Sequence, residues 1–113
     1  MTQQADFFRD LLPTVATGRR EGETIQQAFD AFHKANPHVY RLLVRLARQS
    51  VNAGRRHIGM KMLFEVLRWN YAVYTTGEDF KLNNNFHSRY ARLISENEPD
   101  LAGVFETREL KAA

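Results

Sequence analysis

Several features that would narrow the fold or the location are missing from this sequence. Its 113 residues include no cysteine, which excludes disulfide bonds, thiolate chemistry and cysteine-ligated zinc and fits a reducing compartment. No apolar run approaches the length of a membrane-spanning helix. The N-terminal residues carry Asp6 and Asp10 and lack the positive segment and long apolar stretch of a signal peptide. We therefore expect a soluble, cytoplasmic protein with no membrane partner.

Motifs that would indicate an enzyme are also missing. The sequence has no phosphate-binding glycine loop and no nucleophile elbow. Its four histidines show neither HxxxH nor HExxH spacing (His33, His38, His57 and His87). A carboxylate cluster at Glu96, Glu98 and Asp100 could hold magnesium, but a helix end and a turn at Pro99 explain it as well. We predict no enzymatic activity, no cofactor and no metal site.

Acidic residues are scarce in the middle of the chain and absent from residues 36–64. The stretch from Lys34 to Arg92 has a net formal charge of +8, whereas residues 1–33 carry −2 and residues 93–113 carry −3. A basic centre between acidic ends suggests an anionic partner for the middle. The alternative is a set of ordinary solvated helix faces.

What is present is typical of one globular domain. Apolar residues make up 43% and charged residues 26%, and the length suffices for a single core. We predict an all-α, compact domain of about five helices with one short β-strand or hairpin, divided into a peripheral segment, 1–23, and a core, 24–110. Apolar spacing and turn residues place the helices at 2–12, 24–36, 37–53, 58–74 and 86–97, a loop at 14–23, a strand at 80–82, and a short helix or turn at 99–110.

Helix boundaries have their own signals. Thr24 and Gln27 have the spacing of a capping box, in which each residue satisfies a backbone N–H of the other. Asn36 followed by Pro37 predicts an N-cap and a first helical position. Gly54 is available as a left-handed stop for that helix.

The helix at 58–74 is apolar over most of its circumference, which predicts that it is central and that the others pack around it. One side contains Met60, Leu63, Phe64, Leu67, Tyr71 and Tyr74. The other contains Met62, Val66, Trp69 and Val73. Trp69 lies off the main stripe and could instead anchor a partner or a second subunit.

A basic face on the helix at 37–53 is the first candidate site. Arg41, Arg45 and Arg48 recur at i, i+4 and i+7, opposite the apolar side. Several arginines on one helix can track a phosphate backbone, giving affinity and salt dependence without sequence readout. The face continues into the next segment with Arg55, Arg56, His57 and Lys61.

A second candidate is the acid-free segment from Lys81 to Arg92. Free N–H groups at a helix start favour an anion, and asparagine and arginine suit adenine and guanine edges. Alternatively, the asparagines form only a turn and a cap, for which Asn85 is the expected residue. The candidate residues are Lys81, Asn83, Asn84, Asn85, His87, Ser88, Arg89 and Arg92.

The element order in the second half of the chain resembles that of a winged helix. The order is helix 58–74, strand 80–82, helix 86–97 and a short element after Pro99, although no wing hairpin follows. Residues 61–108 also resemble small proteins of phages and other bacterial mobile elements. The second resemblance implies no particular activity.

Three hypotheses follow from these observations. The first is a nucleic-acid-binding protein, with DNA favoured over RNA, that contacts phosphates through the basic face. The second is a regulator or inhibitor that docks on an acidic protein surface. The third is a self-assembling homo-oligomer that uses the Trp69 side of its helix. Pairing of Arg41, Arg45 and Arg48 with acids from the chain ends would remove most support from the first.

Overall fold

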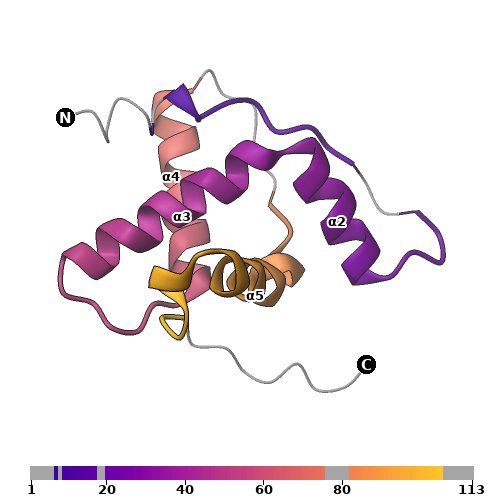
Figure 1. Ribbon diagram of the computed structural model, residues 1–113. Helices are drawn as coiled ribbons and strands as arrows, with labels where there is room; N and C mark the ends of the chain where they lie inside the picture. Colours follow the sequence, from indigo (N-terminus) through magenta and orange to yellow (C-terminus); the bar gives the residue numbers. More distant parts are fainter. Residues whose placement is uncertain (1–6, 8, 18–19, 76–81, 106–113) are drawn as a thin grey trace.

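The computed structural model describes residues 7, 9–17, 20–75 and 82–105 (Figure 1). Within these residues the helices are α2 (Ile25–Ala35), α3 (Pro37–Asn52), α4 (Met60–Tyr74) and α5 (His87–Asn97). Single 3-10 turns precede and follow α5, η1 at Asn84–Phe86 and η2 at Pro99–Leu101. The predicted all-α single domain is confirmed. The predicted helix at 2–12 and strand at 80–82 lie mostly outside the described residues.

Helix α2 begins at the predicted capping box. The Gln27 backbone N–H donates to Thr24 Oγ1 over 3.1 Å, and the Thr24 N–H donates to Gln27 Oε1 over 2.9 Å. Ala28, Phe29 and Phe32 are buried, as the spacing predicts. Residues 14–17 have no regular structure, in agreement with the predicted loop, but residues 11 and 12 have none either, so the predicted helix does not extend to Leu12.

Asn36 joins α2 to α3, but the prediction that its side chain caps α3 is wrong. The side chain is completely buried and binds the N-terminal segment. Its Oδ1 accepts from the Val15 N–H over 2.6 Å, and its Nδ2 donates to the Val15 carbonyl over 2.9 Å and to the Phe32 carbonyl over 3.1 Å. An amide offers one donor and one acceptor side by side, so it can bind both polar groups of one backbone residue. The N-terminal segment is thereby held against the start of α3.

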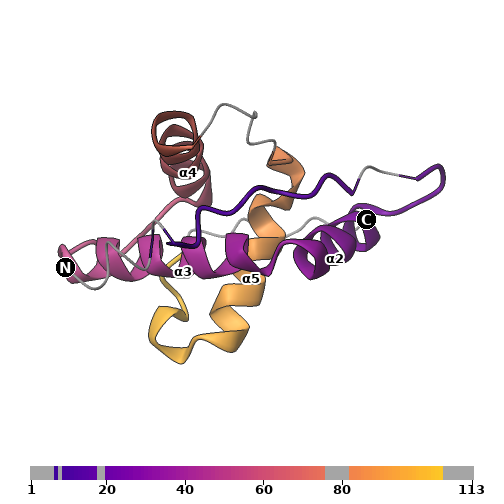
Figure 2. The ribbon, with the colours of Figure 1, turned by 90° about the horizontal axis from the view of Figure 1, so that it is seen from above.

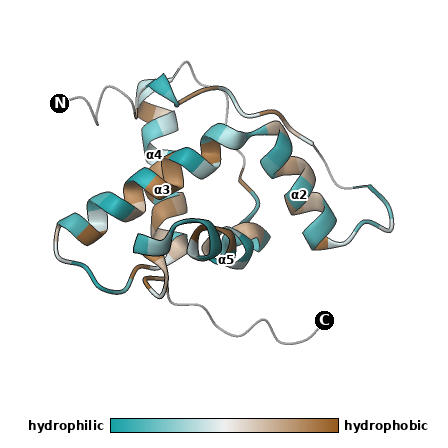
Figure 3. Cartoon of the chain, in the orientation of Figure 1, coloured by the Kyte–Doolittle hydropathy of each residue, from teal (hydrophilic) through white to brown (hydrophobic). Residues whose placement is uncertain are grey.

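Helix α3 is the central element and contacts α2, α4 and α5. Figure 2 shows α5 crossing α3 at a steep angle, and Figure 3 shows hydrophobic residues where α3 and α4 cross. Gly54, with φ +98°, follows the end of α3 as the predicted left-handed stop. The buried residues of α3 are His38, Val39, Leu42, Leu43, Val44, Leu46 and Ala47.

Helix α4 is not surrounded by the others, and the prediction of a central α4 is wrong. One side faces the core through Met60, Leu63, Phe64, Leu67 and Tyr71. The side that carries Trp69 is exposed, and so is Tyr74, which was predicted to face inward. A helix with two apolar sides can bury only one of them when its neighbours, α3 and α5, pack on the same side.

Helix α5 is preceded by the turn η1. The prediction that Asn85 caps this helix is wrong, because the N-cap position of α5 is Phe86, without a side-chain hydrogen bond. Asn83 instead caps η1, where its Oδ1 accepts from the Asn85 N–H over 2.9 Å. Tyr90 and Ile94 of α5 are fully buried, and Leu101 of η2 is buried beside them. A single parallel bridge between Ile58 and Phe105 ties the described end of the chain to the start of α4.

Candidate interaction surfaces

The arginine stripe, Arg41, Arg45 and Arg48 on α3, is where the sequence predicts phosphate binding. The structure places an acid from the N-terminal segment on its first two members. Asp10 lies 2.7 Å from Arg45 and 3.4 Å from Arg41, nitrogen to oxygen. The Asp10 side chain is only 14% exposed. This part of the stripe therefore binds the chain's own N-terminal segment.

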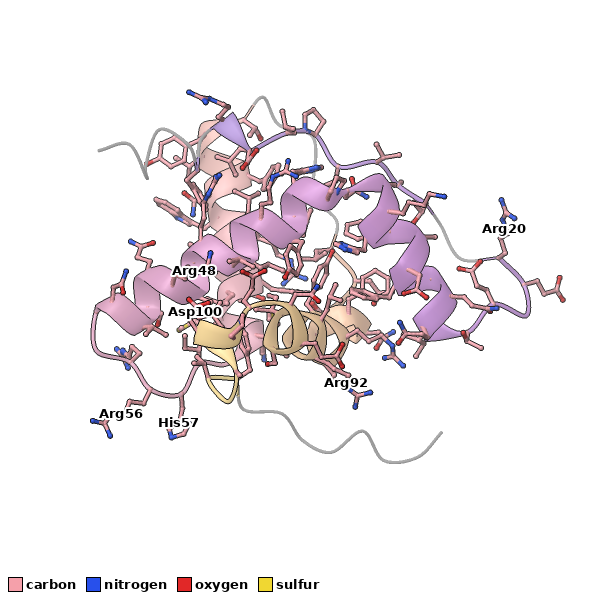
Figure 4. The ribbon with its side chains drawn as sticks, in the orientation of Figure 1. Arg20, Arg48, Arg56, His57, Arg92 and Asp100 are labelled. Atoms are coloured by element: carbon pink, nitrogen blue, oxygen red, sulfur yellow. The ribbon has the colours of Figure 1, made fainter. Side chains whose placement is uncertain are left out.

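The third member of the arginine stripe binds the segment that follows α5. Arg48 lies 2.7 Å from Glu98 and 2.9 Å from Asp100, and Figure 4 shows Arg48 and Asp100 side by side. The hydroxyl of Tyr40 donates to Glu98 over 2.8 Å. Burial and this bond to Glu98 raise the pKa of Tyr40 to about 12. The hydrogen bond from Arg48 lowers the pKa of Asp100.

The charge segregation along the sequence thus corresponds to charge pairing within the fold. All three arginines of the stripe bind acids from the acidic ends, which is the arrangement that removes most support from phosphate binding at this face. The carboxylates Glu98 and Asp100, considered as magnesium ligands, are occupied by Arg48. Within the described ranges no group of three or more metal-binding side chains occurs.

The rest of the first candidate site lies on the loop before α4 and on its first turn. Arg55, Arg56, His57 and Lys61 are exposed, and no ion pair forms between them and any described acid. Figure 4 shows the side chains of Arg56 and His57 pointing away from the protein. These four residues, the basic loop, form a small cationic surface that is separate from the arginine stripe.

In the second candidate site, the asparagines have local roles. Asn83 caps η1, and Asn84 Oδ1 accepts from Arg68 Nη2 over 2.5 Å. The same Arg68 nitrogen donates to the Leu82 carbonyl over 2.9 Å. These contacts agree with the interpretation of the asparagines as a turn and a cap. Asn85 remains exposed.

The other members of the second candidate site are divided between interior and solvent. The His87 ring packs edge-on against Phe64 at 4.2 Å between centroids. Burial lowers the pKa of His87, and the positive charges of Arg68 and Lys61 lower it further. Arg89 Nε donates to a glutamine of α2, Gln26, over 3.1 Å. Ser88 is half-buried, Arg92 projects outward in Figure 4, and Lys81 lies outside the described residues.

The outward side of α4 carries the largest exposed apolar residues of any described helix. Met62 is 49% exposed, Val66 37%, Trp69 59% and Val73 52%. We refer to these four as the α4 stripe. Tyr74, 53% exposed, places its ring edge-on to that of Trp69 at 6.1 Å.

The sequence predicts that other helices pack around this side of α4, and the structure leaves it exposed. Single exposed apolar residues are normal on protein surfaces, whereas a contiguous set marks an interaction site. The signal that could have identified it is the presence of two apolar sides on one helix of a chain too short to build a second core. Trp69 was the one member noted as a potential anchor.

No described helix is both long and apolar enough to cross a membrane. Comparison of the chain with protein-family models, curated proteins and solved structures gives no match. Function is therefore inferred from the arrangement of the side chains.

Proposed function

We propose that this chain is a protein-interaction module whose partner docks on the α4 stripe. The observation that carries the proposal is the row of four large apolar side chains on one face of α4, between 37% and 59% exposed. Tryptophan is enriched among the residues that dominate binding energy, and Trp69 is the most exposed of the four. Covering such a face removes apolar surface from water and thereby stabilises a complex.

The contrast with the arginine stripe favours this function over binding through α3. The guanidinium groups of the stripe already have carboxylate partners within the chain, so a phosphate would have to displace them. The α4 stripe requires no such displacement, because no described segment packs over it.

Capture of partners by the tagged chain from a nuclease-treated lysate tests the proposal. We expect the wild-type chain to retain specific proteins that Val66→Asp does not retain, since a carboxylate in an apolar interface costs several kcal/mol of desolvation, on the order of the binding energy itself. Val15→Asp is the matched control, because Val15 is also exposed, at 56%, and lies outside the stripe. Far-UV circular dichroism checks that both variants fold. Identical retained proteins for wild type and Val66→Asp would overturn the proposal.

The basic loop supports a second candidate function, nucleic-acid binding with DNA favoured over RNA. The specific observation is that Arg55, Arg56 and Lys61 are exposed without a described acidic partner. Each phosphate contact that is lost should reduce the salt slope of binding by about 1.

Fluorescence anisotropy with labelled single- and double-stranded DNA and RNA tests this second function. Arg56→Ala should weaken binding and lower the salt slope. Arg20→Ala, which removes another exposed arginine far from the loop, should not (Figure 4). Absence of binding at low salt would exclude nucleic acid as the partner of the basic loop.

A further inference from the structure

The α4 stripe has a spacing that is the same in both directions along the helix. Val66 follows Met62 by four positions, Trp69 follows Val66 by three, and Val73 follows Trp69 by four. Alternation of four and three is the seam of a coiled coil. A second copy of α4 that runs antiparallel therefore matches the first, with Met62 level with Val73 of the other copy and Val66 level with its Trp69.

Opposed positions in this alignment also complement each other in size. Trp69, the most exposed residue of the stripe at 59%, lies opposite Val66, the least exposed at 37%. Met62, which is long and flexible, lies opposite the short, branched Val73. A large side chain against a small one fills the space between two helices without a clash. A two-fold axis then forms each pair twice.

Side-chain size and helix dipoles distinguish antiparallel from parallel pairing. Parallel helices in register would place Trp69 opposite a second Trp69 and Val66 opposite a second Val66, which overfills one layer and leaves the next one underfilled. Antiparallel helices avoid this mismatch, and their macrodipoles are then opposed. Glu65 and Arg68 already bind each other within the helix, 2.6 Å apart, so they do not set the direction of pairing.

We propose that two copies of this chain pair through the α4 stripe as antiparallel helices, with the two-fold axis between Val66 and Trp69. This inference rests on the proposed function and names its partner as a second copy. Four side chains that are 37–59% exposed do not supply the roughly 800 Å² per partner of a standard interface. The dimer should therefore dissociate on dilution.

Sedimentation and tryptophan emission measure this association in the purified chain. Trp69 is the chain's single tryptophan, so a blue shift of emission with rising concentration reports burial of the stripe itself. Val66→Asp should raise the dissociation constant at least about 100-fold, because it buries a carboxylate opposite the indole. Val15→Asp should leave the dissociation constant unchanged.

Cross-linking tests the direction of pairing, and the absence of cysteine from the chain makes it unambiguous. Met62→Cys and Val73→Cys chains are mixed and oxidised. Antiparallel pairing predicts a mixed disulfide between them as the main product. Identical cysteines of an antiparallel pair lie about 16 Å apart along the helix, too far for a disulfide, which needs Cβ atoms within roughly 4.5 Å.

These experiments test the antiparallel pair and the interaction module separately. A chain that stays monomeric at all concentrations, equal dimerisation by Val66→Asp and Val15→Asp, or homodisulfides as abundant as mixed ones would overturn the antiparallel pair. The proposed function fails separately, when wild type and Val66→Asp retain the same proteins from lysate. A monomeric chain that loses lysate partners on Val66→Asp would keep the interaction module and replace the second copy by another protein.

Discussion

Two stripes with the same kind of helical spacing differ in whether the rest of the chain binds them. The arginine stripe of α3 binds acids from both ends of the chain, whereas the α4 stripe faces solvent. A charged face can be satisfied by a few acidic groups on segments that reach it. An apolar face needs a second packed layer, and a chain of 113 residues has material for one core. An excess of opposite charge at the chain ends can thus indicate internal pairing, and a second apolar side on a helix can indicate an interface.

The largest expected effect compares two neighbouring residues of α4, one in the core and one on the α4 stripe. Leu67 is fully buried and Val66 is 37% exposed. We expect Leu67→Ala to lower the free energy of unfolding by about 2–5 kcal/mol, because it leaves a cavity in the core. Val66→Ala should change it by less than about 0.5 kcal/mol. Urea denaturation at low protein concentration measures both, and similar losses for the two would show that the α4 stripe is part of the folded core.

The next effect concerns how the N-terminal segment reaches α3. Asn36 binds both polar groups of Val15, five residues after the Asp10 that pairs with the arginine stripe. Asn36→Ala should cost about 1–3 kcal/mol of folding free energy, because the partly buried N–H and carbonyl of Val15 lose their partners. Asn85→Ala, at an exposed asparagine, is the control for the same chemical change. Equal stability of the two variants would mean that water replaces the Asn36 amide.

A smaller effect measures the pairing on the arginine stripe directly. A double-mutant cycle with Arg45→Met and Asp10→Asn isolates the interaction of the 2.7 Å pair. We expect a coupling of about 0.5–1 kcal/mol, since the pair is partly exposed, and we expect it to shrink in high salt. A coupling of zero at low salt would return these arginines to the candidates for an external anion.

The smallest expected effect is on how the free energy of unfolding depends on pH, through His38 of α3. Burial lowers the pKa of this histidine below its ordinary 6.5, and the charge of Arg41 lowers it further. The unfolded chain therefore binds a proton near pH 6.5 that the folded chain does not, so stability falls as the pH drops below that value. Burial lowers the pKa of His33 and His87 as well.

Unfolding free energies at pH 7.5 and 5.5 measure this slope. His38→Gln should flatten it without abolishing it, because the partly buried His33 and His87 remain. His57→Gln, at an exposed position on the basic loop, serves as the comparison. A slope that does not differ between wild type and His38→Gln would contradict the assignment.

Local structure was predictable because its causes lie within a turn or two of sequence. The Thr24 capping box, the Gly54 stop and the end of α4 at Tyr74 are all present in the structure as predicted. The errors occur where two local explanations compete. An asparagine can cap a helix, cap a turn or bind a distant backbone group. Asn36 binds the backbone of Val15 and Asn83 caps η1, and in each case the neighbours in space decide the role.

The candidate site was predictable only in part. The helical spacing of the arginine stripe was correct, but its partners Asp10 and Asp100 lie 31 and 52 positions away from Arg41 and Arg48, a range that periodicity does not cover. The basic loop is exposed, as its charge predicts, and none of its residues forms an ion pair with a described acid.

The sequence by itself determined where helices α2 to α5 form and which residues share a face, since caps, breakers and periodicity act along the backbone. Only the tertiary structure decided which faces are used. It placed the acidic ends on α3 and packed one apolar side of α4, leaving the other exposed. The physical reason is that ion pairing and burial depend on which distant segments pack against a given face. That packing is set by how α3, α4 and α5 cross one another and not by any one helix alone.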